Sequence, residues 1–305
     1  MIIAKCPLRI SLAGGSTDLQ DFIDQNDYGA VISFPSTVYS YISIHKNNRK
    51  KYIINYTNRE EIEDLNHIKN DIAREVLKYF CCEPVTMTFN TDIQTSGSGL
   101  ASSSAYMIAA VAAVSRLKKI NLSNFEICNI SLKLERNFNP LTGFQDPYGC
   151  GIGSFKKIIF QKNKDPQITY LKQDFFNNFN MFLKYTGVSR SSTQILQEVV
   201  KVDRKNFLKN VDELEISIKT KNQENFLKLI NKGWEEKKIL SPHIINNENI
   251  KKIDFELKNN HNVLSHRLCG AGNGGYFFIL TRKNYLIEDA ISVNINQDGV
   301  EVFDI

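Results

Sequence analysis

The sequence predicts an α+β protein, because segments with the two-residue period of strands are mixed irregularly with segments of helical period. The 305 residues, of which 42% are hydrophobic and 23% charged, suffice for a sizeable core in one large or two smaller domains. A polar stretch, QKNKDPQ at residues 161–167, is the best candidate for a linker. We therefore predict two lobes, covering residues 1–166 and 167–305.

The first third of the chain has the apolar runs of strands, separated by Gly, Asn and Pro. Such runs occupy residues 2–4, 8–12, 30–34, 38–44 and 52–56, and another follows at 85–89. Residues 67–80 have apolar side chains at every fourth position, which predicts a surface helix. Ser123 and Glu126 form the pattern of a capping box, and this predicts a helix that runs through Arg136.

The second half predicts helices at residues 192–202, 207–220 and 224–240. The glycine-rich turn CGAGNGG at residues 269–275 precedes a strand-like run, YFFIL. The apolar segments 291–295 and 300–303 flank an Asp-Gly pair, so we expect them to form a closing β-hairpin.

Composition excludes several classes of protein. The net charge of +5 is spread along the chain, which suits an anionic small molecule as well as a weak nucleic-acid contact, so charge alone does not decide between them. We expect a small-molecule partner and no nucleic acid. No apolar stretch reaches membrane-spanning length and the N-terminal residues lack a leader pattern, so we expect a cytoplasmic protein without a membrane partner. The six cysteines and five histidines have no metal-site spacing, and we expect buried free thiols.

The most informative stretch is TSGSGLASSSA at residues 95–105, which follows a predicted strand and leads into an apolar helix. Glycines allow close approach of the backbone to a ligand, and free N–H groups at a helix N-terminus bind phosphate; the serines can also cap the helix. A well-capped core helix behind a loop is the alternative. The P-loop pattern is absent, and the G-x-G-x-x-G of residues 270–275 precedes a strand where a dinucleotide site needs a helix.

Three segments together resemble one family. These are PLRISLAGGSTD at residues 7–18, the TSGSGLASSSA loop and the CGAGNGG turn, and they resemble the three motifs of the GHMP kinases, ATP-dependent kinases of small molecules. Within that family, the first segment and YTGVSRSS at residues 185–192 are most similar to the D-glycero-D-manno-heptose 7-phosphate kinases. The resemblance implies two lobes, the N-terminal one like domain 2 of ribosomal protein S5 and the C-terminal one ferredoxin-like.

The resemblance also implies a nucleotide site and a cation. It assigns ATP to the glycine loop, namely Gly97, Ser98, Gly99, Leu100, Ala101, Ser102, Ser103 and Ser104. It assigns Mg²⁺ to Ser103 and Glu135, and the preference of magnesium for hard oxygen ligands agrees with that pair. Without the resemblance, Glu135 would be read as a solvated surface acid of a helix. Two positions depart from the family pattern, since Ala101 replaces a common glycine and Asn273 interrupts the glycines of the turn.

Asp146 matches the catalytic aspartate of the family, where it would accept the proton of the attacking hydroxyl. Because Pro147 follows it, the alternative is that Asp146 caps a short helix. Arg9 matches the basic residue of the first motif and would pair with Asp146 or the phosphoryl group. An outward-pointing strand residue is the alternative for Arg9.

For the acceptor, the resemblance implies a site formed by Gly15, Ser16, Asp18, Gly272 and Arg190. Asp18 would bind sugar hydroxyls, and Arg190, with its neighbouring serines, would bind a phosphate that the acceptor already has. A turn residue and a helix-capping arginine are the respective alternatives.

These assignments lead to one functional hypothesis. We expect a sugar kinase that uses ATP and Mg²⁺ to phosphorylate the anomeric hydroxyl of D-glycero-D-manno-heptose 7-phosphate, giving the 1,7-bisphosphate. An L-fucose- or galactose-type sugar 1-kinase and a catalytically silent binding protein of the same fold are the alternatives. The expected partner is a small-molecule sugar or sugar phosphate. The sequence also leaves open whether the protein forms a homodimer.

Overall fold

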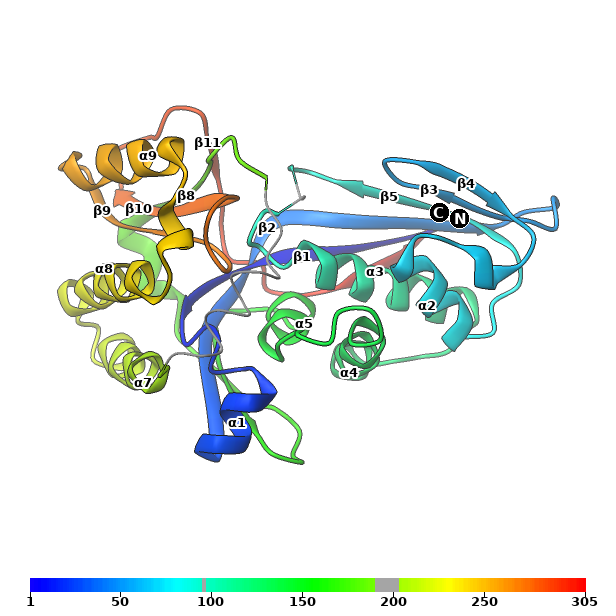
Figure 1. Ribbon diagram of the computed structural model, residues 1–305, viewed down its shortest axis with the longest axis horizontal. Coiled ribbons are helices and arrows are strands. Elements are labelled where there is room, and N and C mark those ends of the chain that lie inside the picture. The colour runs from blue at the N-terminus through cyan, green and yellow to red at the C-terminus, as the bar shows by residue number, and fades with distance from the viewer. Residues whose placement is uncertain (95–96, 190–202) are drawn as a thin grey trace.

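The computed structural model describes residues 1–94, 97–189 and 203–305, and in it two β-sheets are each packed against helices (Figure 1). The first sheet consists of β1 (Ile2–Ala13), β2 (Tyr28–Lys46), β3 (Tyr52–Asn55), β4 (Arg59–Ile62), β5 (Val85–Thr91), β6 (Lys156–Gln161), β7 (Gln167–Tyr170) and β12 (Glu301–Asp304). Its order is β12-β1-β2-β5-β3-β4, with β6 paired to β2 and β7 to β6. The second, antiparallel sheet has the order β11 (Ala290–Ser292), β8 (Phe179–Tyr185), β10 (Tyr276–Arg282) and β9 (Val263–Leu268). The predicted α+β class is confirmed.

The helices form two groups (Figure 1). The first sheet has α2 (Asp71–Tyr79), α3 (Ser102–Leu117), α4 (Asn124–Glu135) and α5 (Gln145–Gly151), and α1 (Gln20–Asn26) lies at its end. The second group is α7 (Lys205–Lys219), α8 (Gln223–Leu240) and α9 (Glu248–Asn259). Helices α8 and α9 pack on β9 of the second sheet, and α7 packs on α8 and on β1 and β2 of the first sheet. Short 3-10 turns are η1 (Leu65–His67), η2 (Gln173–Asn178) and η3 (Pro242–Ile245). No helix within these described ranges is long and apolar enough to cross a membrane.

Two long strands, β1 and β2, lie at the centre of the first sheet. Each of β1 and β2 joins two of the predicted runs into one strand, and bulges at Pro7/Arg9 and Ser11/Ala13 let β1 bend along its partner. The first part of β2 pairs with β6 and its second part pairs with β5. Because β2 is shared in this way, strands from distant parts of the sequence form one sheet.

The predicted apolar helix after the glycine loop is confirmed as α3, and it is the centre of the core. Every residue from Met107 to Ser115 is buried, because α3 lies between the first sheet and the helices α2, α4 and α5. Its many alanines allow this close approach from all sides, which explains an apolar sequence without an exposed face.

Three details of the sequence prediction are wrong. Helix α2 begins at Asp71 and not at 67, because the side chain of Asn70 accepts from the Ala73 N–H and caps it there. The predicted closing hairpin does not form, since β11 pairs with β8 and β12 pairs with β1, in different sheets. The serines do not cap α3 either; its N-cap is Ala101, which makes no side-chain cap bond.

The capping box at Ser123 and Glu126 is confirmed, with both reciprocal hydrogen bonds present at the start of α4. The predicted helix 192–202 lies outside the described residues. Segment 161–167, which we expected to link the lobes, connects β6 to β7 within the first sheet, and the division between residues 166 and 167 stays a prediction. Five of the six free cysteines are buried as expected, and Cys81 is exposed.

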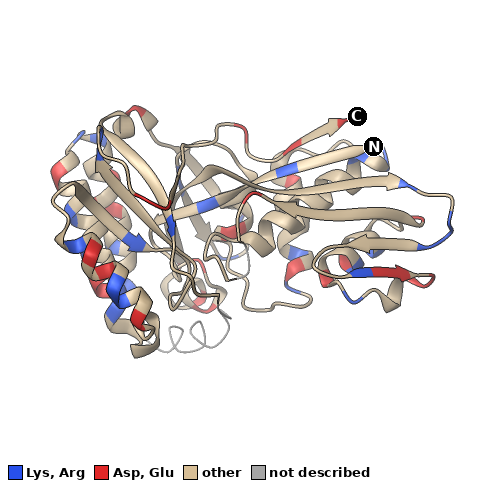
Figure 2. Cartoon of the chain, turned by 90° about the horizontal axis from the view of Figure 1, so that it is seen from above, with Lys and Arg blue, Asp and Glu red and all other residues tan. Residues whose placement is uncertain are grey.

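Basic and acidic residues alternate along the helices of the second group, as the blue and red segments of the ribbon in Figure 2 show. On these helices, lysines and glutamates four residues apart form ion pairs, such as Lys228 with Glu224 at 2.7 Å. The positive net charge of the chain is therefore not concentrated on these helices.

The glycine loop before α3 and the turn after β9 pack against each other backbone to backbone. The N–H of Tyr276 donates to the carbonyl of Ser98 at 3.2 Å. A Cβ at Gly275 would lie 2.2 Å from that same carbonyl oxygen, and a Cβ at Gly99 would lie 2.5 Å from the carbonyl oxygen of Cys269. Both glycines also have positive φ, of 89° and 74°. Glycine is therefore required on each side of this contact.

We predict that Gly275→Ala lowers the free energy of unfolding by about 1–3 kcal/mol or more. Alanine is strained at this φ, and its methyl group collides with the Ser98 carbonyl. Thermal and denaturant unfolding measure the change. Gly233→Ala is the matched control: it lies within α8, its Cβ would meet nothing closer than 3.9 Å, and helix propensity predicts no loss of stability. Equal stability of the two variants would contradict the prediction.

Candidate active site

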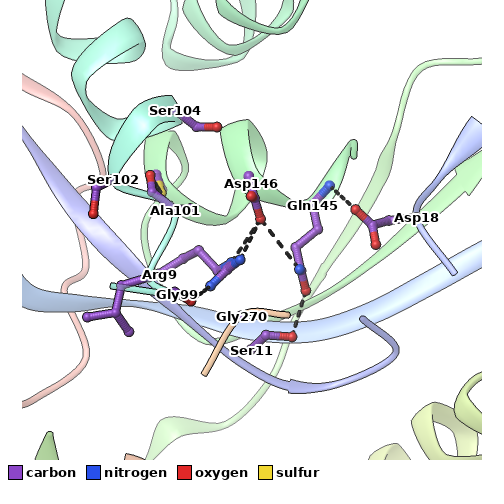
Figure 3. A network of polar contacts seen from close by, with 12 residues as sticks. Arg9, Ser11, Asp18, Gly99, Ala101, Ser102, Ser104, Gln145, Asp146 and Gly270 are labelled. Carbon is purple, nitrogen blue, oxygen red and sulfur yellow. Dashed lines mark hydrogen bonds and ion pairs between the residues drawn. The ribbon is translucent and has the colours of Figure 1, made fainter. Parts of the chain in front are cut away.

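A cavity of about 480 Å³ is lined by three parts of the chain, which lie within residues 9–19, 97–146 and 207–271. One side of the lining comes from β1, the glycine loop with the start of α3, the end of α4 and the start of α5. The other side comes from α7, α8 and the turn after β9. The polar side chains inside it form the network drawn in Figure 3. Segments that are far apart in the sequence therefore meet around one space large enough for a small molecule.

Arg9 and Asp146 form an ion pair in this cavity (Figure 3). Arg9 Nε and Nη2 both donate to Asp146 Oδ1, at 3.0 and 2.7 Å, and Nη1 donates to the carbonyl of Gly99 at 2.7 Å. Arg9 is only 4% exposed, so it is not an outward-facing strand residue. Asp146 is the second residue of α5 and Phe144 is its N-cap, so Asp146 does not cap the helix.

The pair leaves one oxygen of Asp146 available. Oδ1 accepts the two bonds from Arg9 and a longer one, 3.5 Å, from Gln145 Nε2. Among the described residues, no side chain or N–H donates to Oδ2. The carboxylate is thus held in orientation through one oxygen, while the other can accept a proton or a hydrogen bond from a ligand.

Gln145 joins this pair to Asp18. Its side-chain oxygen accepts from Ser11 Oγ at 2.6 Å, and its backbone N–H donates to Asp18 Oδ2 at 2.9 Å. The other oxygen of Asp18 accepts from the Ser16 N–H at 3.0 Å. Burial and then the nearby charge of Asp146 raise the pKa of Asp18 to about 6. Asp18 is therefore a fixed, buried acid and not a simple turn residue.

The glycine loop ends at Ala101, which has the left-handed φ of 61°. This conformation turns the chain sharply, so that α3 starts with the serine run 102–104. Ser98 Oγ lies 2.7 Å from Ser102 Oγ and accepts from the Leu100 N–H at 3.2 Å. The first turn of α3 has no side-chain cap at Ala101, which leaves helix N–H groups beside the cavity for an anion.

Glu135, the last residue of α4, faces the start of α3. Its side chain is 1% exposed and accepts from Ser104 Oγ at 2.6 Å. Burial raises its pKa to about 7, and hydrogen bonds from Ser104 and Ser103 oppose that shift. The expectation of a solvated surface acid is therefore wrong. The carboxylate of Glu135 is buried with two neutral hydroxyls beside it and, among the described residues, without a positive charge. A bound cation would supply that charge.

Most of the predicted site residues lie around this cavity. They are Arg9, Gly15, Ser16, Asp18, Gly97, Ser98, Gly99, Ala101, Ser102, Ser103, Ser104, Glu135 and Asp146. Leu100 is fully buried in the core, and Gly272 packs against Ile244 behind the turn; neither lines the cavity. Arg190 and its neighbouring serines 191 and 192 lie outside the described residues.

Sequence reasoning missed several polar residues that line the cavity, among them Ser11, Gln145, Asn210, Lys237 and Arg267. Gln145 directly precedes the predicted Asp146, and Arg267 is two residues before the CGAGNGG turn, so their positions beside motifs were a usable signal. Asn210 and Lys237 lie on amphipathic helices, where polar residues usually face solvent, and nothing in the sequence distinguishes them.

The comparisons with known proteins agree with this geometry. Residues 66–154 match the family description "GHMP kinases N terminal domain". The chain is 26% identical to the D-glycero-alpha-D-manno-heptose 7-phosphate kinase of Campylobacter jejuni, over 94% of this chain and 92% of that protein. It is 30% identical to the mevalonate kinase of Thermococcus onnurineus, over 40% of this chain and 33% of that protein.

Solved structures of the same fold cover the whole chain. A D-glycero-D-manno-heptose 1-phosphate kinase from Bacteroides thetaiotaomicron has a TM-score of 0.76 at 18% identity and covers 100% of this chain and 99% of its own. The galactokinase of Lactococcus lactis, solved with galactose, has a TM-score of 0.75 at 14% identity, covering 100% and 95%. Residues 66–154 therefore match a GHMP kinase N-terminal domain, and the whole chain has the fold of GHMP kinases, which are phosphotransferases with an alcohol acceptor.

Glu135 should make stability depend on pH. Because its folded pKa of about 7 is above its ordinary value of 4.5, the folded state binds more protons than the unfolded state between these values. Without divalent cations, stability should fall as pH rises from about 4.5 to 7, by roughly 3 kcal/mol from this group. In Glu135→Gln this component should be absent.

Denaturant unfolding in a chelator at pH 5 and pH 8 measures the difference. Glu83→Gln, which removes an exposed carboxylate, should keep the pH dependence of the parent protein. The pH dependence of Asp18 is common to all three proteins and cancels in the comparison. If the parent and Glu135→Gln changed equally between the two pH values, the environment described for Glu135 would be wrong.

Proposed function

We propose that this protein is an ATP-dependent sugar kinase that phosphorylates the anomeric hydroxyl of D-glycero-D-manno-heptose 7-phosphate to give the 1,7-bisphosphate. The observation on which the proposal mainly depends is the Asp146 carboxylate, which Arg9 holds through one oxygen, in the same cavity as an open helix N-terminus and the buried Glu135. The choice of sugar follows the Campylobacter jejuni relative, which is similar over nearly the full length of both chains.

The nucleotide phosphates would bind at the glycine loop and the start of α3. Gly97, Gly99 and Ala101 all have positive φ, a backbone shape that turns successive N–H groups toward an anion. The N–H groups of Ser103 and Ser104, in the first turn of α3, would add the helix dipole to this site. Because the loop has no lysine, backbone donors and Arg9 would provide most of the local positive character.

A magnesium ion fits the residues beside this loop. Ser103 and Glu135 offer hard oxygen ligands, and the raised pKa of Glu135 indicates that its carboxylate is not neutralised by a cationic partner. Within the described ranges, no group of three or more His, Cys, Asp and Glu residues could hold a metal, so these two residues would act together with nucleotide phosphates and water. When bound, the ion would neutralise charge on the transferring phosphoryl group.

Asp146 would act as the general base. The C1 oxygen attacks the γ-phosphorus, the bond to the bridging oxygen of ADP breaks, and the proton of the C1 hydroxyl passes to Asp146 Oδ2. Arg9 fixes the carboxylate through Oδ1 and contributes positive charge next to the reacting group. The ion pair of Arg9 and Asp146 would accelerate the reaction mainly by positioning, because the Asp146 oxygen that accepts the proton is oriented before the substrate binds.

The acceptor would lie on the side of the cavity formed by the segment after β1. Gly15, Ser16 and Asp18 line it there. Both oxygens of Asp18 already accept backbone N–H bonds, which fixes the carboxylate so that its remaining lone pairs can accept from sugar hydroxyls. A Cβ at Gly143 would lie 2.1 Å from Asp18 Oδ2, so the glycine at 143 is needed for this arrangement.

The substrate assignment is tested by measuring ADP release from ATP and Mg²⁺ with a panel of acceptors. Turnover with D-glycero-D-manno-heptose 7-phosphate, and phosphorylation at C1 by NMR, are expected. Preference for unphosphorylated L-fucose or galactose would instead identify a different sugar 1-kinase. Binding of nucleotide or sugar without ADP release for any acceptor would identify a binding protein of the same fold.

We predict that Asp146→Asn lowers kcat by about 10²–10⁴-fold, the usual contribution of a general base, and changes nucleotide affinity little. Asparagine keeps the shape and an acceptor for Arg9 but does not take up the proton. Steady-state kinetics and calorimetry with a non-hydrolysable ATP analogue measure the two effects. Asp165→Asn, an exposed residue of the β6–β7 connection, is the matched control and should leave both unchanged. A kcat within threefold of the parent would remove Asp146 from this role.

A further inference from the structure

Arg267 is a buried cation in the wall of the cavity. It is on β9, opposite Phe278 of β10, and is 8% exposed. Its Nη1 donates to the carbonyl of Leu12 on β1. Its Nε is buried and has no hydrogen-bond partner, and within the described ranges no carboxylate forms an ion pair with it.

The other two deeply buried arginines near the cavity differ in this respect. Arg9, 4% exposed, pairs with Asp146, and Arg204, 3% exposed, pairs with Asp21. Arg267 has a neutral carbonyl as its partner and lies close enough to Arg9 for the two charges to repel. Burial lowers its pKa to about 10, which still leaves it protonated at neutral pH. A buried charge without a counter-ion is unfavourable, so this position favours an anion.

The geometry of the guanidinium indicates the kind of anion. Nη1 donates to Leu12 and Nε is enclosed by protein atoms, so among the described residues Nη2 is the guanidinium donor that is neither fully buried nor hydrogen-bonded. A phosphate group presents oxygens that accept from such a donor and has the charge to neutralise the guanidinium.

We propose that Arg267 binds a phosphate group of a bound substrate through its Nη2. The inference rests on the proposed function, in which both substrates have phosphate: the acceptor has one at its far end, and ATP has the group that is transferred. Arg267 would then be a specificity-determining residue if the phosphate belongs to the acceptor, and would assist phosphoryl transfer if it belongs to ATP.

The test compares Arg267→Gln, which removes the charge, with Arg267→Lys, which keeps the charge and loses the planar guanidinium. Calorimetry measures binding of heptose 7-phosphate, unphosphorylated heptose, ADP, a non-hydrolysable ATP analogue and pyrophosphate, and so needs no turnover. Arg282→Gln is the matched control, because it removes an exposed arginine from the adjacent strand β10. Thermal unfolding checks that each variant is folded.

If the phosphate belongs to the acceptor, Arg267→Gln should weaken heptose 7-phosphate binding at least tenfold, and Arg267→Lys less, with nucleotide affinity unchanged. The preference for the phosphorylated over the unphosphorylated heptose should be lost in parallel. If it belongs to ATP, the affinity for the ATP analogue should fall tenfold while that for ADP changes little.

The proposal is overturned if every ligand binds both folded variants within twofold of the parent. Arg267 would then only connect β9 to β1 through Leu12. A failure of the proposed function looks different: neither heptose would bind the parent protein, whereas loss of ATP-analogue or pyrophosphate binding in Arg267→Gln would still identify Arg267 as a phosphate ligand.

Discussion

The guanidinium of Arg9 connects the three segments on which the cavity depends. It projects from β1, donates to the Gly99 carbonyl in the glycine loop at 2.7 Å, and holds Asp146 at the start of α5 at 2.7 and 3.0 Å. At 4% exposure, this charge has exchanged its water for fixed partners. A buried pair of this kind contributes orientation more than net stability, because its desolvation offsets much of the attraction. The positions of the loop and of the acid are therefore fixed together.

Around this pair, the cavity contains acidic and basic groups that are unevenly matched. Asp18 and Glu135 have raised pKa values, near 6 and near 7, because burial removes water from their carboxylates. Arg267, on β9 of the second sheet, has no acidic partner among the described residues. A bound cation would compensate the buried carboxylate of Glu135, and a bound phosphate would compensate the buried charge of Arg267. The proposed substrates of a phosphotransferase supply both kinds of charge.

Much of the fold could be read from local pattern. The capping box at Ser123, the apolar helix α3 and the glycine turn before β10 are each specified by neighbouring residues, so their prediction needed no knowledge of distant contacts. Pairing between distant strands is not specified in this way. The segments around residues 291–303 have the pattern of a hairpin, yet they join two sheets because each finds a better-matched edge, at β8 and at β1.

The sequence by itself determined the α+β class, the glycine loop, the acidic and basic residues beside each motif and the likeness to a kinase family. These depend on short-range spacing, which a linear chain displays directly. Only the tertiary structure decided which oxygen of Asp146 is held, that Glu135 is buried against serine hydroxyls, and that Arg267 faces the same cavity without a carboxylate. Those properties depend on burial and on contacts between separate segments, from the 31 positions between Ser104 and Glu135 to the 137 positions between Arg9 and Asp146. The residue types are given by the sequence, whereas the burial and the neighbouring groups that shift their pKa values are produced by tertiary packing.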